Sequence, residues 1–177
     1  MVKKLLFFLG FFMIFVLALI AFSPKESIYY FTEHQLQNYK LEIANERLAD
    51  HFFSLQISDA KVYAEGIEAA NVAKTRVTVL GLYNAVDVQN IELASIVESF
   101  LPKDIQQLHI EYSILNPLEV SIYAKGGFGE IGGGLDLLEQ KIQLTLQPAK
   151  VMHSRYRSTL QEFKKESDGG YSYVQAL

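Results

Sequence analysis

An unbroken apolar run near the N-terminus constrains this chain more than any other feature of its sequence. Leu5–Phe22 holds 18 residues without a charge, and Lys3 and Lys4 precede it. About 20 apolar residues span a bilayer, whereas the hydrophobic region of a signal peptide has about 7–15. The length of the run lies at the boundary between the two, so the segment is either a signal peptide or a membrane anchor.

The residues after the run favour an anchor that stays attached. The best small-x-small cleavage candidate is 21–23, but Pro24 would then follow the cut, where proline blocks the extended backbone that a peptidase binds. Lys3 and Lys4 place the N-terminus inside by the positive-inside rule, which exports everything after Ser23. In a bacterium, we expect a single-pass inner-membrane protein with a cytoplasmic N-terminus and most of its chain in the periplasm.

The exported part is acidic and contains no cysteine. All 20 Asp and Glu follow Phe22, against 14 Lys and Arg, because Lys3 and Lys4 account for two of the 16. A net-acidic domain argues against nucleic-acid binding, which needs clustered Lys and Arg. The absence of cysteine excludes disulfides, a thiolate zinc site and a cysteine nucleophile.

The hydrophobic period divides the chain into three segments. Residues 1–22 form the cytoplasmic tip and anchor. Ser23 and Glu26 fit the N-cap and N3 positions of a helix, which predicts a helical stalk over 23–38. Over 39–177 the apolar residues mostly alternate with polar ones, which is typical of strands with one solvated face.

Turn and helix signals interrupt the alternating segments of 39–177. The expected turns are Asn45-Glu46, Ser58-Asp59, Glu65-Gly66, Gly81, Asn84, Asn116-Pro117 and Glu139-Gln140. We expect short helices over Ile91–Leu101 and Ser154–Glu166, the second ended by Asp168-Gly169-Gly170, and a terminal strand over Tyr171–Leu177. The predicted fold class is α+β and β-dominated: a transmembrane helix, then an antiparallel twisted sheet or half-open sandwich with two or three short helices.

A glycine cluster matches the dinucleotide-binding pattern G-x-G-x-x-G over 127–132. That pattern binds a pyrophosphate only where it links a strand to a helix, and Gly133 and Gly134 disfavour a helix start there. The alternative is a glycine-rich hairpin or bulged strand pair, and we expect no cofactor. The glycines assigned to this structural turn are Gly126, Gly127, Gly129, Gly132, Gly133 and Gly134.

Catalytic and metal-binding patterns are weak. The four histidines are His34, His51, His109 and His153. None lies at helix spacing from another His, Asp or Glu, and no G-x-S-x-G turn is present. We therefore expect no metal site, no catalytic residues and no enzyme activity.

Two groups of side chains are candidates for contacts with other molecules. Phe52 and Phe53 are adjacent in a predicted strand, so one should point to each face, either inside a sandwich or as an exposed patch. The basic residues Arg155, Arg157, Lys164 and Lys165 are either a solvated helix face or an interface with an acidic partner or lipid headgroups.

The stretch from Ile110-Glu111-Tyr112 through Gly126–Gly134 to Leu135-Asp136-Leu137 resembles the strand–glycine–strand unit of bacterial type II secretion system protein N and the broader AsmA-like envelope proteins. Phe53–Ile57, Ala60–Val62 and Val86–Val88 resemble the family's sheet of short strands, and the likeness covers Tyr39–Pro148. The resemblance implies one anchor, an exported β-rich domain and an accessory role in an envelope-spanning machine for secretion or pilus-like assembly.

The expected function is therefore a periplasmic scaffold that binds other envelope proteins. The alternative is a lipid-binding or lipid-transfer module. A lipid carrier would line a groove with residues from many strands, namely Leu55, Ile57, Val79, Val120, Ile122 and Leu144, whereas a scaffold would pack these residues against one another. The absence of a gap of small residues outside 126–134 favours packing.

Overall fold

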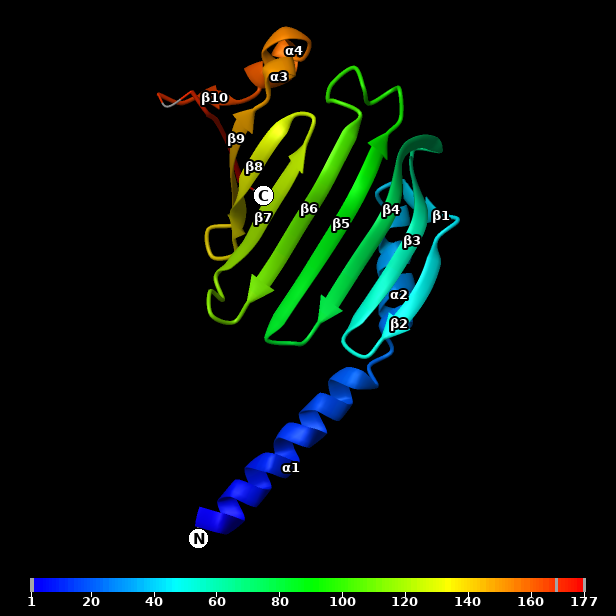
Figure 1. Ribbon diagram of the computed structural model, residues 1–177, viewed down its shortest axis with the longest axis vertical. Helices are drawn as coiled ribbons and strands as arrows, with labels where there is room; N and C mark the ends of the chain where they lie inside the picture. The colour runs from blue at the N-terminus through cyan, green and yellow to red at the C-terminus, as the bar shows by residue number, and fades with distance from the viewer. Residues whose placement is uncertain (1, 168, 177) are drawn as a thin grey trace.

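The N-terminal apolar run forms a single helix that projects from a β-rich domain (Figure 1). The computed structural model describes residues 2–167 and 169–176. Helix α1 (Val2–Ala21) contains a segment, Lys3–Ala21, that is long and apolar enough to cross a membrane. Met1 lies outside the described residues. The expected apolar N-terminal helix is thus present, and a short junction joins it to α2 (Lys25–Gln37).

The rest of the chain is dominated by strands. They are β1 (Leu41–Ala44), β2 (Arg47–His51), β3 (Ser54–Ala64), β4 (Ile67–Val79), β5 (Tyr83–Leu93), β6 (Asp104–Ser113), β7 (Glu119–Gly126), β8 (Gly129–Asp136), β9 (Lys141–Pro148), β10 (Lys164–Lys165) and β11 (Tyr171–Ala176). Two single-turn helices, α3 (Lys150–Ser154) and α4 (Arg157–Gln161), follow β9. The expected terminal strand is confirmed as β11; Leu177 lies outside the described residues.

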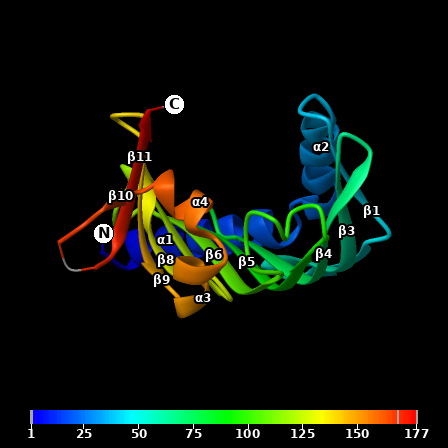
Figure 2. The same ribbon diagram turned by 90° about the horizontal axis from the view of Figure 1, so that it is seen from above.

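All described strands belong to one open antiparallel sheet. Their order is β1-β3-β4-β5-β6-β7-β8-β9-β11-β10, with β2 also paired to β3. The β-dominated class and the single twisted sheet are confirmed, and no second sheet makes a sandwich within the described residues. Seen from above, the sheet curves into a trough, with α2 inside one wall and β11 in the other (Figure 2).

Strand alternation gives the sheet one apolar and one polar face. Val77, Val86, Ile110 and Ile122 pair in one register row across β4–β7. The neighbouring row, which points to the other side, contains Arg76, Asp87, His109 and Tyr123. Helix α2 packs on the apolar face, because Tyr29 contacts the cluster of Leu55, Ile57 and Ala60. The apolar face is therefore the concave inside of the trough.

Left-handed residues inside two strands keep this face continuous. Asp59 in β3 has φ 57° and Asn90 in β5 has φ 54°. Ile57 and Ala60, on either side of Asp59, are three residues apart, a spacing that strict alternation would place on opposite faces. They nevertheless lie in one buried cluster, and Val88 and Ile91, on either side of Asn90, lie in another. The inward and outward alternation therefore shifts by one residue at Asp59 and at Asn90. Asp and Asn tolerate the left-handed backbone conformation that this shift requires. The expected turn at Ser58-Asp59 is wrong, because β3 continues through it paired to β4.

The expected helix over Ile91–Leu101 is also wrong. Ile91 and Leu93 belong to β5, where they pair with Ile105 and Ala70 of the flanking strands. The residues that follow make only a turn, in which the Leu101 N–H donates to the Val97 carbonyl at 3.2 Å. Once β5 has taken the first residues, the remainder is too short to form a stable helix.

The expected helix over Ser154–Glu166 is replaced by α3 and α4, which begin four residues earlier and end at Gln161. Met152, Tyr156 and Leu160 from this segment are buried in one cluster with Leu146. The chain bends at Tyr156 (φ −118°, ψ 38°). It then leaves the helix so that β10 can pair with β11, and this long-range pairing overrides the helical period.

Helix α2 forms where the sequence predicts a helix, but it is not a free stalk. It lies against β1, β2 and β3 as part of the β-rich domain (Figure 2). Pro24 occupies the N-cap position in place of Ser23, whose hydroxyl donates to the Ile20 carbonyl at 2.8 Å. The segment 23–38, expected as a helical stalk, therefore packs against the sheet through α2.

Candidate functional site: the concave apolar groove

The lower part of the concave face is an open apolar groove. A hollow of about 340 Å³ lies over the ends of β4–β7 nearest α1. Its lining residues are Val77, Thr78, Val79, Asn84, Ala85, Val86, Ile110, Tyr112 and Val120. Most of these are half-buried rather than packed, so the sheet presents apolar surface there with no cover from another element of the described chain.

The upper part of the same face is closed. Phe128, Leu146, Met152 and Leu160 form a buried cluster in which α3 and α4 cover the upper ends of β7–β9. The Thr159 hydroxyl donates to the Phe100 carbonyl at 2.6 Å, which joins α4 to the β5–β6 connection. The groove therefore has a closed upper end and opens toward the end of the domain that carries α1.

One wall of the concave face is α2, and Tyr29 is one of the side chains that this helix turns toward the sheet, where it contacts Leu55, Ile57 and Ala60. Burial raises the pKa of the Tyr29 phenol far above its ordinary value, and the carboxylate of Glu46 raises it further. The phenol therefore stays neutral at physiological pH. None of the residues that line the hollow carries a charge, so none of them could act as an acid or base on a ligand there.

The titratable groups gather on the convex face instead. His109 Nδ1 lies 2.6 Å from Asp87 Oδ1, and its Nε2 lies 3.2 Å from Glu111 Oε2. The Tyr83 hydroxyl also donates to Glu111, at 3.2 Å. Burial alone would lower the pKa of His109, but the hydrogen bonds to the two carboxylates outweigh it and raise that pKa. Cross-strand register brings these residues together, so helix spacing could not reveal the cluster.

This cluster has the character of a charge network on a solvated sheet face. The side chains of His109, Asp87 and Glu111 are 26%, 34% and 36% exposed, and none of them lines the concave hollow or the hollow beside Gly133. No group of three or more His, Asp or Glu with the geometry of a metal site occurs among the described residues.

The six glycines singled out in the sequence do not all lie in a turn. Gly127 lies in the β7–β8 turn, Gly126 ends β7, and the other four belong to β8. Gly129 has φ 114° and faces the backbone of Gln147 and Ala149. Gly133 and Gly134 approach neighbouring backbone closely, whereas a Cβ on Gly132 would meet open space. The segment is a strand pair with close backbone contacts, because β8 continues into β9 pairing and no helix follows the glycines.

The four basic residues are exposed at the upper end of the domain. Arg157 and Lys165 line a hollow with His153, whereas Arg155 and Lys164 do not. The Arg157 Nε donates to the His153 carbonyl at 2.6 Å, and the Arg155 guanidinium lies 5.7 Å from the Tyr156 ring centre. This end lies away from α1 (Figure 1), so these residues do not face the membrane that α1 would span.

Residues expected to line a lipid groove fall into two groups. Leu55 and Ile57 are buried beneath α2, as packing predicts. Val79 and Val120 line the open hollow, while Ile122 and Leu144 are half-buried on the same face. Seven of the nine lining residues lie outside the expected set, among them Val86, Ile110 and Tyr112. These three belong to alternating runs that are visible in the sequence, but alternation does not reveal whether another element covers them.

Phe52 and Phe53 do not point to opposite faces of a strand. Both lie in the β2–β3 turn, with ring centres 4.7 Å apart, and both are exposed. The chain reverses at these residues because β2 pairs back along β3, so the expectation that they point to opposite faces of a strand is wrong.

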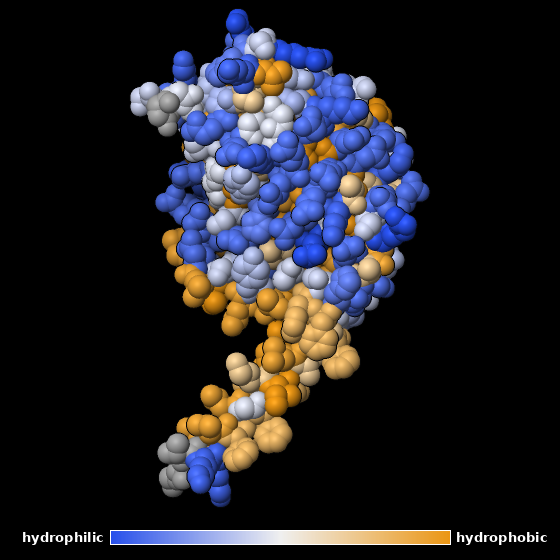
Figure 3. Space-filling model, viewed as in Figure 1, coloured by the Kyte–Doolittle hydropathy of each residue, from blue (hydrophilic) through white to orange (hydrophobic). Residues whose placement is uncertain are grey.

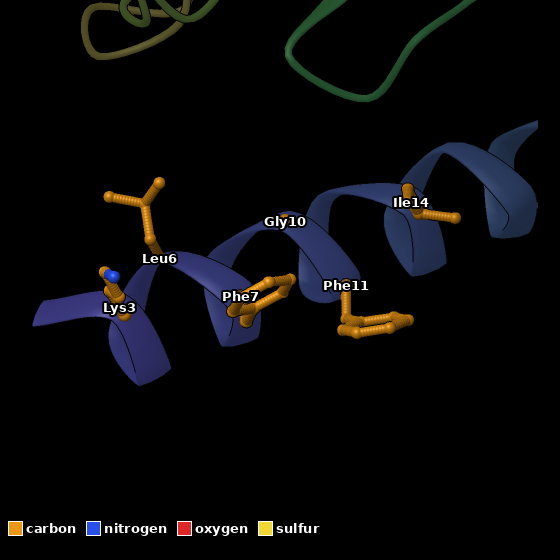
Figure 4. A pocket seen from close by; sticks show the side chains of 6 residues that line it. All are labelled: Lys3, Leu6, Phe7, Gly10, Phe11 and Ile14. Carbon is orange, nitrogen blue, oxygen red and sulfur yellow. The ribbon is translucent and has the colours of Figure 1, made fainter. Parts of the chain in front are cut away.

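A second apolar hollow, of about 440 Å³, runs along α1 and is lined by six residues of that helix alone: Lys3, Leu6, Phe7, Gly10, Phe11 and Ile14 (Figure 4). Gly10 leaves the space between the larger side chains. Because this segment is the candidate membrane span, the hollow would face lipid in a bilayer, and we do not treat it as a ligand site.

Comparisons of the chain with protein-family models, with curated proteins and with solved structures found no match.

Proposed function

We propose that this chain is a single-pass membrane protein whose β-rich domain binds the acyl chain of a lipid in the concave groove. The observation that carries the proposal is the open, uncharged hollow on the apolar face, closed at its upper end and open beside the membrane anchor. Its volume of about 340 Å³ lies within the range of about 300–1,000 Å³ typical of small-molecule sites.

The hydrophobic effect provides the driving force. Each buried CH₂ group contributes about 0.8 kcal/mol, so a bound acyl segment and the valines and isoleucines beneath it would both leave water. A headgroup would remain outside the lower opening, because no charged side chain lines the hollow to receive it.

The topology proposed here follows from Lys3 and Lys4 at the N-terminal end of α1. By the positive-inside rule these lysines favour a cytoplasmic N-terminus, and we propose that the β-rich domain lies in the periplasm of a bacterial inner membrane. Membership of a type II secretion or pilus-like machine rests on the resemblance of 39–148 alone.

The test is lipid retention by the full chain, extracted in mild detergent and measured by native mass spectrometry. Val120→Asp puts a carboxylate into the groove, and its matched control, Ser121→Asp, puts the same group on the convex face of the same strand. We expect one lipid per chain in the parent and the control, and loss of that lipid in Val120→Asp. Equal lipid content in all three proteins would refute the proposal.

The second candidate is a scaffold that binds envelope proteins through an open sheet edge. Beyond Ser172, the outer edge of β11 (residues 173–176) pairs with no strand of the described chain, because β10 covers only Tyr171 and Ser172. Unpaired strand edges are sites where another chain can add a strand. The exposed Arg157 and Lys165 beside this edge would suit an acidic partner.

A photoreactive residue at Val174, which is exposed on β11, tests this candidate in membranes. A cross-link to one partner protein, absent from a control label at the equally peripheral Tyr39, would support the scaffold. Cross-links to lipid only, or equal labelling from both positions, would count against it.

A further inference from the structure

We propose that the lower rim of the β-rich domain inserts into the surface of the same bilayer that α1 spans. The lower rim is defined here by exposed apolar residues in four turns: Phe52 and Phe53, Leu82, Leu115 and Leu118, and Leu138. They lie in the β2–β3, β4–β5, β6–β7 and β8–β9 turns. Leu115 is 92% exposed and Leu138 is 75% exposed.

The four turns lie at one end of the sheet, on the side of the domain from which α1 leaves (Figure 1). In the space-filling view, hydrophobic residues gather along this lower edge next to the helix, whereas the body above is largely hydrophilic (Figure 3). Glu139 is the only charged residue in these turns. Contiguous exposed apolar surface of this kind marks an interaction site on a protein in water.

Backbone hydrogen bonds hold the turns together as one surface. The Ile114 N–H donates to the Leu82 carbonyl at 2.8 Å, which links the β6–β7 turn to the β4–β5 turn. The Leu137 N–H donates to the Leu118 carbonyl at 2.8 Å, which links the next pair. The rim is therefore ordered before it meets a partner, and little conformational entropy is lost on insertion.

The junction with the anchor keeps the rim at the membrane. Only residues 22–24 separate α1 from α2, a reach of about 11 Å when extended. Lys25 is 3% exposed, and its Nζ donates to Asp50 Oδ1 at 3.0 Å and to the Ala21 carbonyl at 3.4 Å. This ion pair connects the start of α2 to β2 beside the end of α1. The domain is therefore held close to the membrane surface by a short, fixed connection and not by a flexible linker.

A bilayer is the partner that these features fit, because the anchor already brings lipid to this end and the rim matches it in polarity. The groove opens at the rim, since Val79 and Val120 lie next to the β4–β5 and β6–β7 turns. Where the proposed acyl-chain binding also holds, a lipid could enter the groove from the leaflet without crossing water. Rim insertion itself does not depend on that binding.

The experiment uses single cysteines in the full chain, which has none of its own. Leu115→Cys reports on the rim, and Phe100→Cys, 62% exposed at the opposite end, is the matched control. Each variant carries an environment-sensitive fluorophore and is reconstituted in nanodiscs of phosphatidylethanolamine and phosphatidylglycerol. We expect a blue-shifted emission at 115, quenched several-fold by spin-labelled lipid, and a water-like, unquenched emission at 100.

Equal, water-like emission at both positions would overturn the proposal. A blue shift at 115 that spin-labelled lipid does not quench would overturn it too, because a protein or a second copy of the chain would then cover the rim. Lipid retention in the Val120→Asp and Ser121→Asp pair is scored separately. Insertion at 115 with no groove-dependent lipid would defeat the groove alone, and the reverse result would defeat the rim alone.

Discussion

The upper and lower ends of the trough are built from the same strands, yet one is a packed core and the other an open groove. At the upper end Leu146 is 2% exposed and Met152 is 1% exposed. At the lower end Ile110 and Val120 are only half-buried, and the turns below them are exposed. The apolar alternation is the same at both ends, so cover by α3 and α4 makes the difference.

That difference shows how one sheet can combine a source of stability with an open apolar surface. Closely packed side chains at the upper end stabilise the domain, and the lower end leaves apolar surface uncovered. Substitutions of the same kind at the two ends should therefore have very different effects on the free energy of unfolding.

The largest contrast is expected between Leu146→Ala and Leu115→Ala. Leu146 is enclosed by the upper cluster, so its truncation leaves a cavity and should lower the free energy of unfolding by about 2–5 kcal/mol. Leu115 contacts little of the domain, so the same truncation should change it by about 0.5 kcal/mol or less. Urea unfolding of the full chain in detergent measures both. Similar losses would mean that the two ends do not differ as described.

A second contrast compares two glycines of β8, Gly129 at the closed upper end and Gly132 further along the strand. Gly129→Ala would force a side chain onto a backbone with φ 114°, with its Cβ 2.7 Å from the Ala149 nitrogen. We expect a loss of about 1–3 kcal/mol in the free energy of unfolding. Gly132→Ala is the control, since its Cβ meets nothing within 4 Å, and should stay within about 0.5 kcal/mol. Thermal unfolding of both variants measures the two losses. Equal losses would mean that the close backbone contact at Gly129 does not constrain this position.

The smallest effect on stability is expected from the titration of His109, which lies on the convex face of the sheet. Its folded-state pKa lies above the ordinary value of 6.5, so the stabilisation by Asp87 and Glu111 is fully present below that value. It is lost as the pH rises through the folded-state pKa. The melting temperature should therefore fall between pH 6 and pH 8 by more in the parent than in Asp87→Asn.

Lipid retention should not follow this titration, because the groove lies on the opposite face. A pH-dependent loss of lipid in the parent that Asp87→Asn abolishes would show that the convex face takes part in the groove.

Local pattern was enough to predict part of the fold. The apolar N-terminal helix, the strand alternation, the terminal strand and the turns at Glu65-Gly66, Asn116-Pro117 and Glu139-Gln140 all form where the sequence predicts them. Each depends on neighbours within a few residues, such as an apolar period or a turn-forming pair.

The failures share a cause outside the local pattern. Ile91 and Leu93 fit a short helix as well as a strand, and pairing with β4 and β6 decides between them. Asp59 has the chemistry of a turn residue, yet β4 holds it inside a strand. The His109 cluster needed the cross-strand register, which no spacing along the chain reveals.

By itself, the sequence determined which face of each strand is apolar and that an apolar helix precedes the domain, because side-chain periodicity is a local property of the chain. It could not determine which part of the apolar face stays uncovered. Only the tertiary structure decided that α2 and the α3–α4 segment close one wall and the upper end and leave Val79, Ile110 and Val120 open at the end of the domain that carries α1. Burial depends on where distant segments come to rest, and long-range packing sets those positions.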